Sequence, residues 1–287
     1  MKETNNVPSI HELERLAVQM RMCIVDMMGA DKAHHFGGSL SAADLMTAIY
    51  FHAMRYDPRD PAWPERDRFV MSKGHCVPAQ YAALAMLGVF PTAELATLKQ
   101  LGSRLQGHPA AHILPGIEAC TGSLGQGLSF ANGMALAGRM RRLDYRVYCL
   151  LGDGETHEGQ VWEAARTTVR QRLANVTAIV DRNGLKAMDP SYDADDLCRL
   201  GGRWEALGWA VREVDGHDMA AICGALDWAR AEDKPCAILA ATVKGKGVSF
   251  LEGQAQYHNA ALTREQIAAA RAELEGRREQ ITEVGAR

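Results

Sequence analysis

The sequence predicts an α/β protein built on a doubly wound parallel sheet with helices on both faces. Arg146–Leu151 is a nearly continuous apolar run, and Val176–Val180 is a second one. Such runs are typical of parallel strands, which helices cover on both sides. Between the two runs, apolar residues recur every four positions, the spacing of an amphipathic helix: Val161, Ala165, Val169 and Leu173. Strand, helix and strand in this order predict a parallel crossover.

Residues 1–65 are predicted to form a helical region ahead of this sheet. Ser9 and Glu12 match a capping box and precede a long amphipathic stretch, Leu13–Met28. A loop is expected over Ala33–Gly38. After it, Ser41 and Asp44 are expected to open a second helix, in which Leu45, Ala48 and Ile49 share one face.

The remaining elements extend the sheet and close the chain. A Pro-rich linker over 57–64 leads into a short strand, Arg68–Ser72. Two more strands are predicted at Trp209–Val214 and Ala237–Val243, with a helix over Met219–Arg230 between them. Residues 263–287 are predicted to form a C-terminal helix that Thr263 and Gln266 can cap. We therefore expect residues 1–287 to form a single domain.

Composition narrows the class of protein. The chain has 287 residues, 47% of them hydrophobic, and a formal net charge of −3, which gives no reason to expect a nucleic-acid surface. Its seven cysteines are scattered, with no C-x-x-C pair, as in reduced cytoplasmic proteins. No uncharged run approaches the about 20 residues that span a bilayer, and the N-terminus has no signal-like apolar segment. A soluble cytoplasmic protein is expected.

Polar residues follow the two strongest strands at the point where each strand ends. Gly152, Asp153 and Gly154 follow the first strand, and Asn183 follows the second. If the strands are neighbours, Asp153 and Asn183 emerge side by side at one sheet edge. Carboxylate and amide oxygens suit Mg²⁺, and the glycines allow backbone N–H groups to approach a diphosphate. The other interpretation is an ordinary strand-to-helix turn with a capping Asp, but the pairing favours a metal–diphosphate site.

These segments resemble the thiamine diphosphate fingerprint, and their surroundings resemble the transketolase family. The likeness extends from about Ile10 to about Leu262. Its motifs, in order, are Asp67–His75, Gly107–Pro109, Thr121–Gly127, Gly152–Glu155, Glu158–Ala164, Lys244–Gly247 and His258. The resemblance implies a thiamine-diphosphate-binding fold of the diphosphate-binding (PP) type. It also implies a transferase of carbohydrate metabolism that moves a two-carbon ketol unit from a ketose or ketose phosphate to an aldose.

The resemblance also assigns site residues. It implies that Asp153, the Asn183 side chain and the Leu185 carbonyl hold Mg²⁺, with Ca²⁺ or Mn²⁺ as substitutes. It places Gly154, Asn183 and Lys244 at the diphosphate of thiamine diphosphate. Further cofactor contacts are expected from the residues that line the aminopyrimidine and the reacting carbon: Gly122, Leu124, His75 and His258.

Four of the ten histidines lie in glycine-flanked or loop segments that the resemblance places around the reacting carbon of the cofactor: His35, His75, His108 and His258. The resemblance implies that these four are catalytic. Imidazole suits this role because it can donate and accept protons and bind sugar hydroxyls near neutral pH. Zinc is the competing idea, but the four lie far apart in sequence without metal-ligand spacing. His11, His52, His157 and His217 are interpreted as surface or capping groups, and His112 is unassigned.

Departures from the family leave the substrate open. His34 and Phe36 flank His35 where the family has smaller residues, so they either reshape the donor pocket or point away from it. Lys186–Met188 also differs from the commoner versions. Donor and acceptor sugars, the pathway and the source organism therefore stay undetermined.

A whole transketolase is about twice as long as this chain, and its second half supplies the pyrimidine-binding residues. The resemblance therefore implies a C-terminal partner subunit, an α₂β₂ heterotetramer, and inactivity of this chain alone. It leaves open whether the chain binds cofactor without that partner. Glu158 is either near the subunit contact or a first-turn acid favoured by the helix dipole. The alternatives are a subunit of another thiamine-dependent carboligase, using an α-keto acid or a specialised sugar, and a non-catalytic cofactor-binding scaffold.

Overall fold

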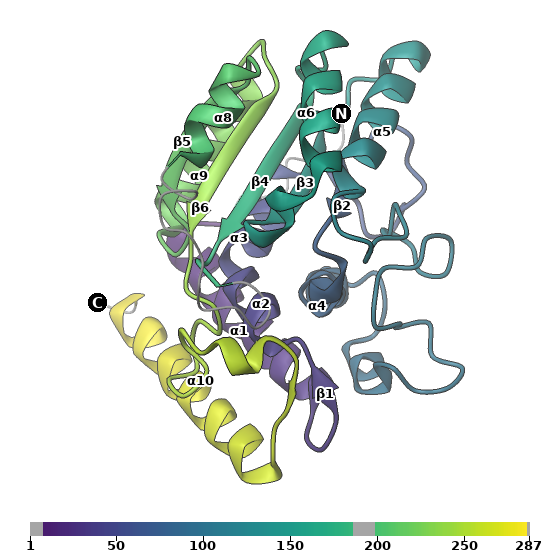
Figure 1. Ribbon diagram of the computed structural model, residues 1–287. Coiled ribbons are helices and arrows are strands. Elements are labelled where there is room, and N and C mark those ends of the chain that lie inside the picture. The colour runs from purple at the N-terminus through teal and green to yellow at the C-terminus, as the bar shows by residue number, and fades with distance from the viewer. Residues whose placement is uncertain (1–7, 186–198, 286–287) are drawn as a thin grey trace.

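The computed structural model describes residues 8–185 and 199–285. Its main sheet has five strands, every neighbouring pair parallel, in the order β2–β3–β4–β6–β5 (Figure 1). The predicted doubly wound parallel sheet is therefore confirmed. The strands are β2 (Arg68–Met71), β3 (Val147–Gly152), β4 (Val176–Arg182), β5 (Ala210–Asp215) and β6 (Cys236–Ala241).

Helices cover both faces of this sheet. Side chains alternate along β3, so Tyr148 and Leu150 enter one hydrophobic core while Cys149 and Leu151 enter the other. The first core includes residues of α1 (Ile10–Met28), α4 (Val77–Met86) and α9 (Met219–Ala231). The second includes residues of α5 (Gly127–Arg141), α6 (Gly159–Arg170) and α8 (Leu200–Ala206). This double coverage explains why β3 and β4 are apolar throughout.

Both predicted helix caps form. The Ser9 N–H donates to Glu12 Oε2 at 2.7 Å and the Glu12 N–H donates to Ser9 Oγ at 3.3 Å, which completes the capping box of α1. At the other end of the chain, the Gln266 N–H donates to Thr263 Oγ1 at 3.2 Å, at the start of α10 (Arg264–Gly285). Helix α10 packs against α1, below the sheet in Figure 1.

The predicted loop over Ala33–Gly38 and the predicted helix start at Ser41 are wrong. Ala33–His34 is a short strand, β1, paired antiparallel with β7 (Ala260–Ala261). Helix α2 (Phe36–Ser41) then ends at Ser41, and α3 (Ala43–Ala48) and a π-helical turn, η1 (Ile49–Ala53), follow. Burial explains the difference: the Ser41 hydroxyl donates to the Gly38 carbonyl and to the Asp181 carboxylate, so it caps no helix.

Smaller differences concern element boundaries. Helix α6 ends at Arg170, so Leu173 lies beyond it. Four 3₁₀ turns complete the secondary structure of the described residues: η2 (Gly74–Cys76), η3 (Thr92–Thr97), η4 (Gly154–His157) and η5 (Ala255–His258). The first seven residues and the Lys186–Met188 segment, on which two sequence interpretations depend, lie outside the described residues.

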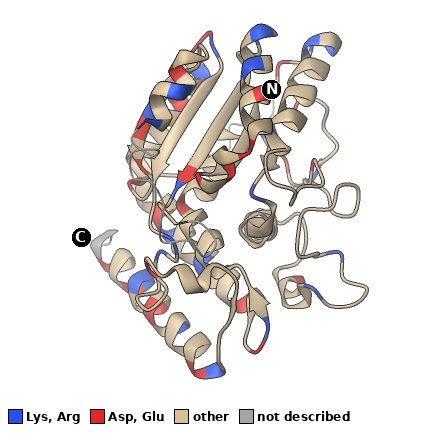
Figure 2. Cartoon of the chain, viewed as in Figure 1, with Lys and Arg blue, Asp and Glu red and all other residues tan. Residues whose placement is uncertain are grey.

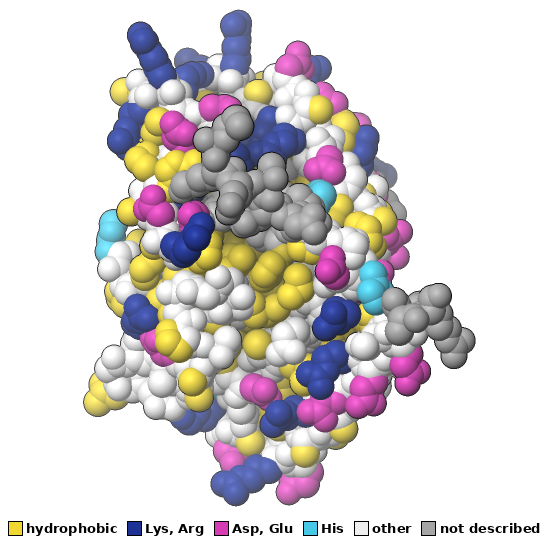
Figure 3. Space-filling view, turned by 180° about the vertical axis from the view of Figure 1, so that it is seen from behind, with side chains coloured by type: hydrophobic (Ala, Val, Ile, Leu, Met, Phe, Trp, Pro, Cys, Tyr) yellow, Lys and Arg dark blue, Asp and Glu magenta, His cyan; other side chains and the backbone are white. Residues whose placement is uncertain are grey.

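Charge and hydrophobicity are unevenly spread over the surface. Lys and Arg gather at the upper ends of α5 and α6, whereas both signs mix along α10 (Figure 2). On the opposite face, hydrophobic side chains gather in the middle (Figure 3). Within the described residues, no helix is long and apolar enough to cross a membrane.

Candidate functional site

A cavity of about 390 Å³ opens where β3 and β4 end, the position expected for a ligand in this type of sheet. All eleven residues predicted to be catalytic, cofactor-binding or metal-binding line it, together with four others. The predicted ones are His35, His75, His108, Gly122, Leu124, Asp153, Gly154, Asn183, Leu185, Lys244 and His258; the others are Gly38, Lys73, Gly152 and Glu155. Segments from His35 to His258 thus meet at one place.

Asp153, Asn183 and Leu185 carry the oxygen atoms predicted to bind a metal ion, and they line one side of this cavity, called here the Asp153 wall. Gly152 of β3 pairs in register with Asp181 of β4, so the loops that follow the two strands lie side by side. The buried Asp153 carboxylate accepts the Gly154 N–H through Oδ1 and the Gly184 N–H through Oδ2, both at 2.7 Å. Burial, together with the nearby Asp181 carboxylate, raises the pKa of Asp153 to about 6. A cation bound here would relieve both effects, and the oxygen donors suit a hard ion.

Lys244 faces this wall. Its ammonium donates to the Leu185 carbonyl at 3.0 Å and lies 3.0 Å from His258 Nδ1. Burial and the neighbouring Lys73 lower the pKa of Lys244. A positive charge thus stands next to the Leu185 oxygen, where a diphosphate group would bring compensating negative charge.

The four histidines are packed ring against ring. The His35 centroid lies 4.9 Å from that of His75, 5.2 Å from that of His258 and 6.5 Å from that of His108. Burial, and after it the charge of Lys73, lowers the pKa of His75 to about 2; burial also lowers the pKa values of His35 and His258 to about 4. These three rings are therefore neutral near pH 7 and can each donate and accept a hydrogen bond.

A zinc site is not supported by this cluster. Although the four rings meet, the described part of the chain contains no group of three or more His, Cys, Asp or Glu side chains arranged to hold a metal ion. The Asp153 wall offers oxygen ligands instead: one carboxylate, one side-chain amide and one backbone carbonyl. Mg²⁺ prefers oxygen ligands of these kinds.

The glycine-rich segment brings backbone close to the histidines. Gly122 has a φ of 140°, and a Cβ added there would lie 2.8 Å from the His108 ring. Gly125 has a φ of 86° and its N–H donates to Glu155 Oε1 at 2.9 Å. Glycine is needed at both positions. Gly122 and Leu124 both line the cavity.

Two charged groups of the cavity were missed from the sequence. Lys73, within the Asp67–His75 motif, forms a buried ion pair with Asp181. Its ammonium also donates to the Gly38 carbonyl at 3.0 Å. Glu155 is buried and accepts from the Ser72 hydroxyl at 2.5 Å and from the Gly152 N–H at 3.1 Å. The sequence did contain a signal for both residues, since each is an ionisable residue shortly after an apolar strand. A charged group buried there must find a partner.

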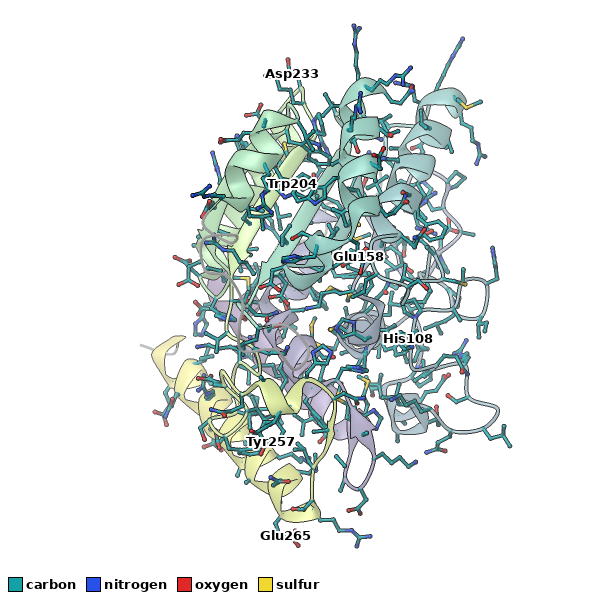
Figure 4. All side chains as sticks on the ribbon, in the orientation of Figure 1. His108, Glu158, Trp204, Asp233, Tyr257 and Glu265 are labelled. Carbon is teal, nitrogen blue, oxygen red and sulfur yellow. The ribbon has the colours of Figure 1, made fainter. Side chains whose placement is uncertain are left out.

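The residues that flank His35 point away from the cavity. Phe36 is fully buried in the hydrophobic core and His34 is 2% exposed, and neither lines the site. Of the two interpretations that the sequence left open, the geometry supports the second, since only His35 of this segment reaches the cavity. Glu158 is exposed and precedes α6 without a side-chain capping bond (Figure 4), and His112 has a φ of 69°.

His217 was wrongly interpreted as a surface or capping group. Its side chain is 13% exposed, Nδ1 lies 2.6 Å from Asp44 Oδ2, and Nε2 accepts the Val243 N–H at 2.8 Å. It therefore belongs to a largely buried polar network behind the segment that carries Lys244.

Comparison with known proteins agrees with this geometry. Residues 13–284 match the family described as transketolase, thiamine diphosphate binding domain, and the chain belongs to that family. The match continues past Leu262, where the sequence resemblance was expected to stop. Over its length the chain corresponds to the N-terminal subunit of a divided transketolase, and it is thus a subunit of a transferase.

Its relatives are of two lengths. The chain is 44% identical over 265 residues to the 6-deoxy-6-sulfo-D-fructose transketolase subunit SqwG of Clostridium sp. (strain MSTE9), covering 92% of this chain and 96% of that one. It is 41% identical over 275 residues to one subunit of the apulose-4-phosphate transketolase of Phocaeicola vulgatus, covering 95% and 97%. Against the human transketolase it is 40% identical over 260 residues but spans only 41% of that protein.

A solved structure shows the same fold. The transketolase of Campylobacter jejuni superposes with a TM-score of 0.86 at 32% identity, and the match covers 93% of this chain and 43% of that one. This chain therefore spans less than half the length of the transketolase whose structure it matches.

Proposed function

We propose that this chain, with a partner subunit, transfers a two-carbon ketol unit from a ketose or ketose phosphate to an aldose. One observation carries the proposal: the Asp153 wall and the four histidines converge on a single cavity at the carboxyl ends of β3 and β4. A metal–diphosphate wall opposite several neutral imidazoles fits carbon–carbon bond chemistry at a bound cofactor.

Thiamine diphosphate and Mg²⁺ fit the residues that are present. Asp153, the Asn183 side chain and the Leu185 carbonyl would hold the ion, with Ca²⁺ or Mn²⁺ as substitutes. Gly154, Asn183 and Lys244 would hold the diphosphate. Gly122 and Leu124, which line the cavity, would lie along the ring system. The cavity volume lies within the range of cofactor sites.

The histidines would bind the sugar and move protons. Thiamine diphosphate, when bound, supplies the nucleophilic carbon for a ketose carbonyl. His35, His75, His108 and His258 would hydrogen-bond sugar hydroxyls and exchange protons with them, because a neutral imidazole ring has one donor and one acceptor. His75 and His258 would also contact the cofactor, since both stand next to a lysine of the site.

The partner would be the pyrimidine-binding subunit, in an α₂β₂ heterotetramer. Two relatives that match along nearly their whole length are named as subunits, which supports a two-component enzyme. The apolar area in the middle of the face in Figure 3 supports burial against another chain, because large exposed apolar areas are typical of interfaces. We further propose that residues 1–287 form a single domain and that the protein is cytoplasmic.

Specialised sugars are the second candidate substrate class. The subunit relatives are named for 6-deoxy-6-sulfo-D-fructose and apulose-4-phosphate, neither of them an ordinary pentose phosphate. An α-keto acid donor is the less favoured alternative, because four imidazoles suit a polyol better than a carboxylate. A non-catalytic scaffold would not require the buried charges of the site.

Reconstitution tests the proposal directly. The chain is co-expressed with a candidate pyrimidine-binding subunit, and ketose-to-aldose transfer is measured with thiamine diphosphate and Mg²⁺, over ketose phosphates, a sulfosugar and pyruvate. Transfer that requires both chains and both cofactors is the expected result. An assembled pair that binds no thiamine diphosphate would show that the assignment of the cavity is wrong.

A further inference from the structure

A buried polar network lies behind the segment that carries Lys244. Its centre is Asp44 on α3, whose carboxylate accepts two N–H groups of Arg21 from α1, at 3.0 and 2.5 Å. It also contacts His217 Nδ1 at 2.6 Å. Arg21 and Asp44 are 5% and 7% exposed, so these groups depend on one another for their hydrogen bonds.

The second ring nitrogen of His217 reaches the backbone next to Lys244. His217 Nε2 lies 2.8 Å from the N–H of Val243. A backbone amide can only donate, so Nε2 must be the unprotonated nitrogen and Nδ1 must carry the proton that is donated to Asp44. Both ring nitrogens are thereby engaged, and the ring connects Asp44 to the Val243 amide.

The turn after β5 is built to place this ring. The Gly216 N–H donates to the Ala241 carbonyl at 2.7 Å, and a Cβ at Gly216 would lie 2.4 Å from the Thr242 side chain. The His217 N–H donates to Asp215 Oδ1 at 2.8 Å. Only glycine allows the turn to approach the end of β6 this closely, and His217 is therefore brought beside Val243.

Arg21 holds the other side of the same segment. Its Nε donates to the Lys246 carbonyl at 3.0 Å, and a Cβ at Gly247 would meet the Arg21 side chain at 2.8 Å. Between the two attachment points, the Gly245 N–H donates to the Gly37 carbonyl at 2.9 Å. The backbone on both sides of Lys244 is thus hydrogen-bonded to groups that converge on Asp44.

We propose that Arg21, Asp44 and His217 form a positioning network for Lys244. His217 fixes the amide before this lysine and Arg21 fixes a carbonyl after it, and together they determine where the ammonium stands against Leu185 and His258. The inference rests on the proposed function only in taking Lys244 as a cofactor ligand. A purely structural network, which serves only to bury the Asp44 charge, would need the Asp44 contacts and not the Val243 contact.

Two substitutions of His217 separate these roles. In His217→Asn the side-chain amide stands near the Nδ1 position, so it can still donate to Asp44 but does not reach Val243. In His217→Gln the carbonyl oxygen reaches the Nε2 position and can accept the Val243 N–H, while the Asp44 contact is given up. If the network positions Lys244, His217→Asn should disturb the Lys244 segment more than His217→Gln does. A purely structural role predicts the reverse.

The first measurement is hydrogen exchange by mass spectrometry on the full chain, in peptides spanning Val243–Gly247. Loss of one hydrogen bond should speed exchange about three- to tenfold in the Asn variant, and leave the Gln variant near the wild type. His52→Asn, which alters the His52–Asp227 pair (2.9 Å) far from this segment in sequence, is the control and should change nothing in the segment. Equal exchange in the Asn and Gln variants, or faster exchange in Gln, would overturn the proposal.

The second measurement is the calorimetric Kd for thiamine diphosphate with Mg²⁺, in the chain assembled with its partner. His217→Asn should weaken binding about three- to tenfold and His217→Gln less. Lys244→Met is the reference: an unchanged Kd there would contradict the role given to Lys244, whereas the exchange result would still decide the network. If His217→Asn does not fold, Arg21→Lys serves in its place, since a single ammonium replaces the three nitrogens that Arg21 directs at Asp44 and the Lys246 carbonyl. Unchanged exchange in that variant would likewise count against positioning.

Discussion

The ammonium of Lys73 and the carboxylate of Asp181 form a buried ion pair at the floor of the cavity, with side chains 2% and 0% exposed. Asp181 also accepts the hydroxyls of Ser41 and Thr242, so one carboxylate joins α2, β4 and the end of β6. Burial is the largest single influence on Lys73 and lowers its pKa, but the charge and hydrogen bond of Asp181, with smaller contributions from Cys76 and Asp153, together outweigh it and raise the pKa of Lys73 above its ordinary value. The lysine is therefore charged in the folded protein.

Breaking this pair should destabilise the chain strongly. Lys73→Met leaves the Asp181 charge buried without its cation, and we expect a loss of about 3–5 kcal/mol in the free energy of unfolding, measured by urea denaturation. Arg264→Ala, which removes an exposed contact to Asp31 at 3.5 Å, is the control and should cost at most about 1 kcal/mol. Similar losses in the two variants would mean that the buried pair contributes no more than a surface one.

Asp153→Ala should abolish Mg²⁺-dependent binding of thiamine diphosphate. The substitution removes the only carboxylate of the proposed metal set, and calorimetric titration with and without Mg²⁺ measures the effect. Glu163→Ala, at an exposed position of α6, is the matched acidic control and should bind as the wild type does. If the Asp153 variant still binds in a metal-dependent manner, the metal ligands have been misassigned.

His258→Ala should separate binding from turnover. The ring stands 3.0 Å from the Lys244 ammonium and packs against His35 and His75. We expect cofactor affinity to fall only slightly, because the proposed metal and diphosphate ligands remain, and kcat to fall about 10²-fold or more, the usual contribution of a proton-transferring group. His11→Ala on α1 is the control. A variant that turns over normally would remove His258 from the catalytic set.

Buried histidines should make the fold sensitive to acid. The folded-state pKa of His75, about 2, lies below its ordinary 6.5, so the unfolded chain binds a proton that the folded chain does not. This contribution to stability is complete above pH 6.5 and is lost progressively as the pH falls below 6.5. His75→Gln should therefore lose less stability than the wild type between pH 7 and pH 5, by urea midpoints at both values. The raised pKa of Asp153 acts in the opposite direction in both proteins, so the difference between them isolates His75. Equal losses of stability in the wild type and His75→Gln would contradict the lowered pKa of His75.

The parallel sheet could be predicted because its central strands are apolar on both faces, a pattern that few other arrangements produce. Helix α1 was predicted correctly, but helix α2 was not. Phe36 and Leu40 are fully buried, and their glycine-rich surroundings indicate a loop until the packing of α2 under the cavity is known. Local propensity favoured a loop, and tertiary burial favoured a helix.

The site followed a similar division. Cavity residues that stand in a recognisable local motif, such as Asp153 between two glycines, could be assigned to the site from the sequence. Lys73, Asp181 and His217 belong to the interior because of partners far away in sequence: Lys73 meets Asp181, and His217 meets Asp44. Such partners depend on how β4, β5 and β6 are ordered in the sheet, and spacing along the chain does not contain that information.

The short ladder between β1 and β7 has a consequence for how the protein matures. It pairs Ala33 with Ala261, joining the first part of the chain to its last part, directly beside His35 and His258. During synthesis this ladder can close only after Ala260 and Ala261 have left the ribosome, because contacts between distant segments form only once both exist. The nascent chain is therefore without a complete histidine cluster until His258 has emerged, and we expect any cofactor capture to follow the synthesis of both segments.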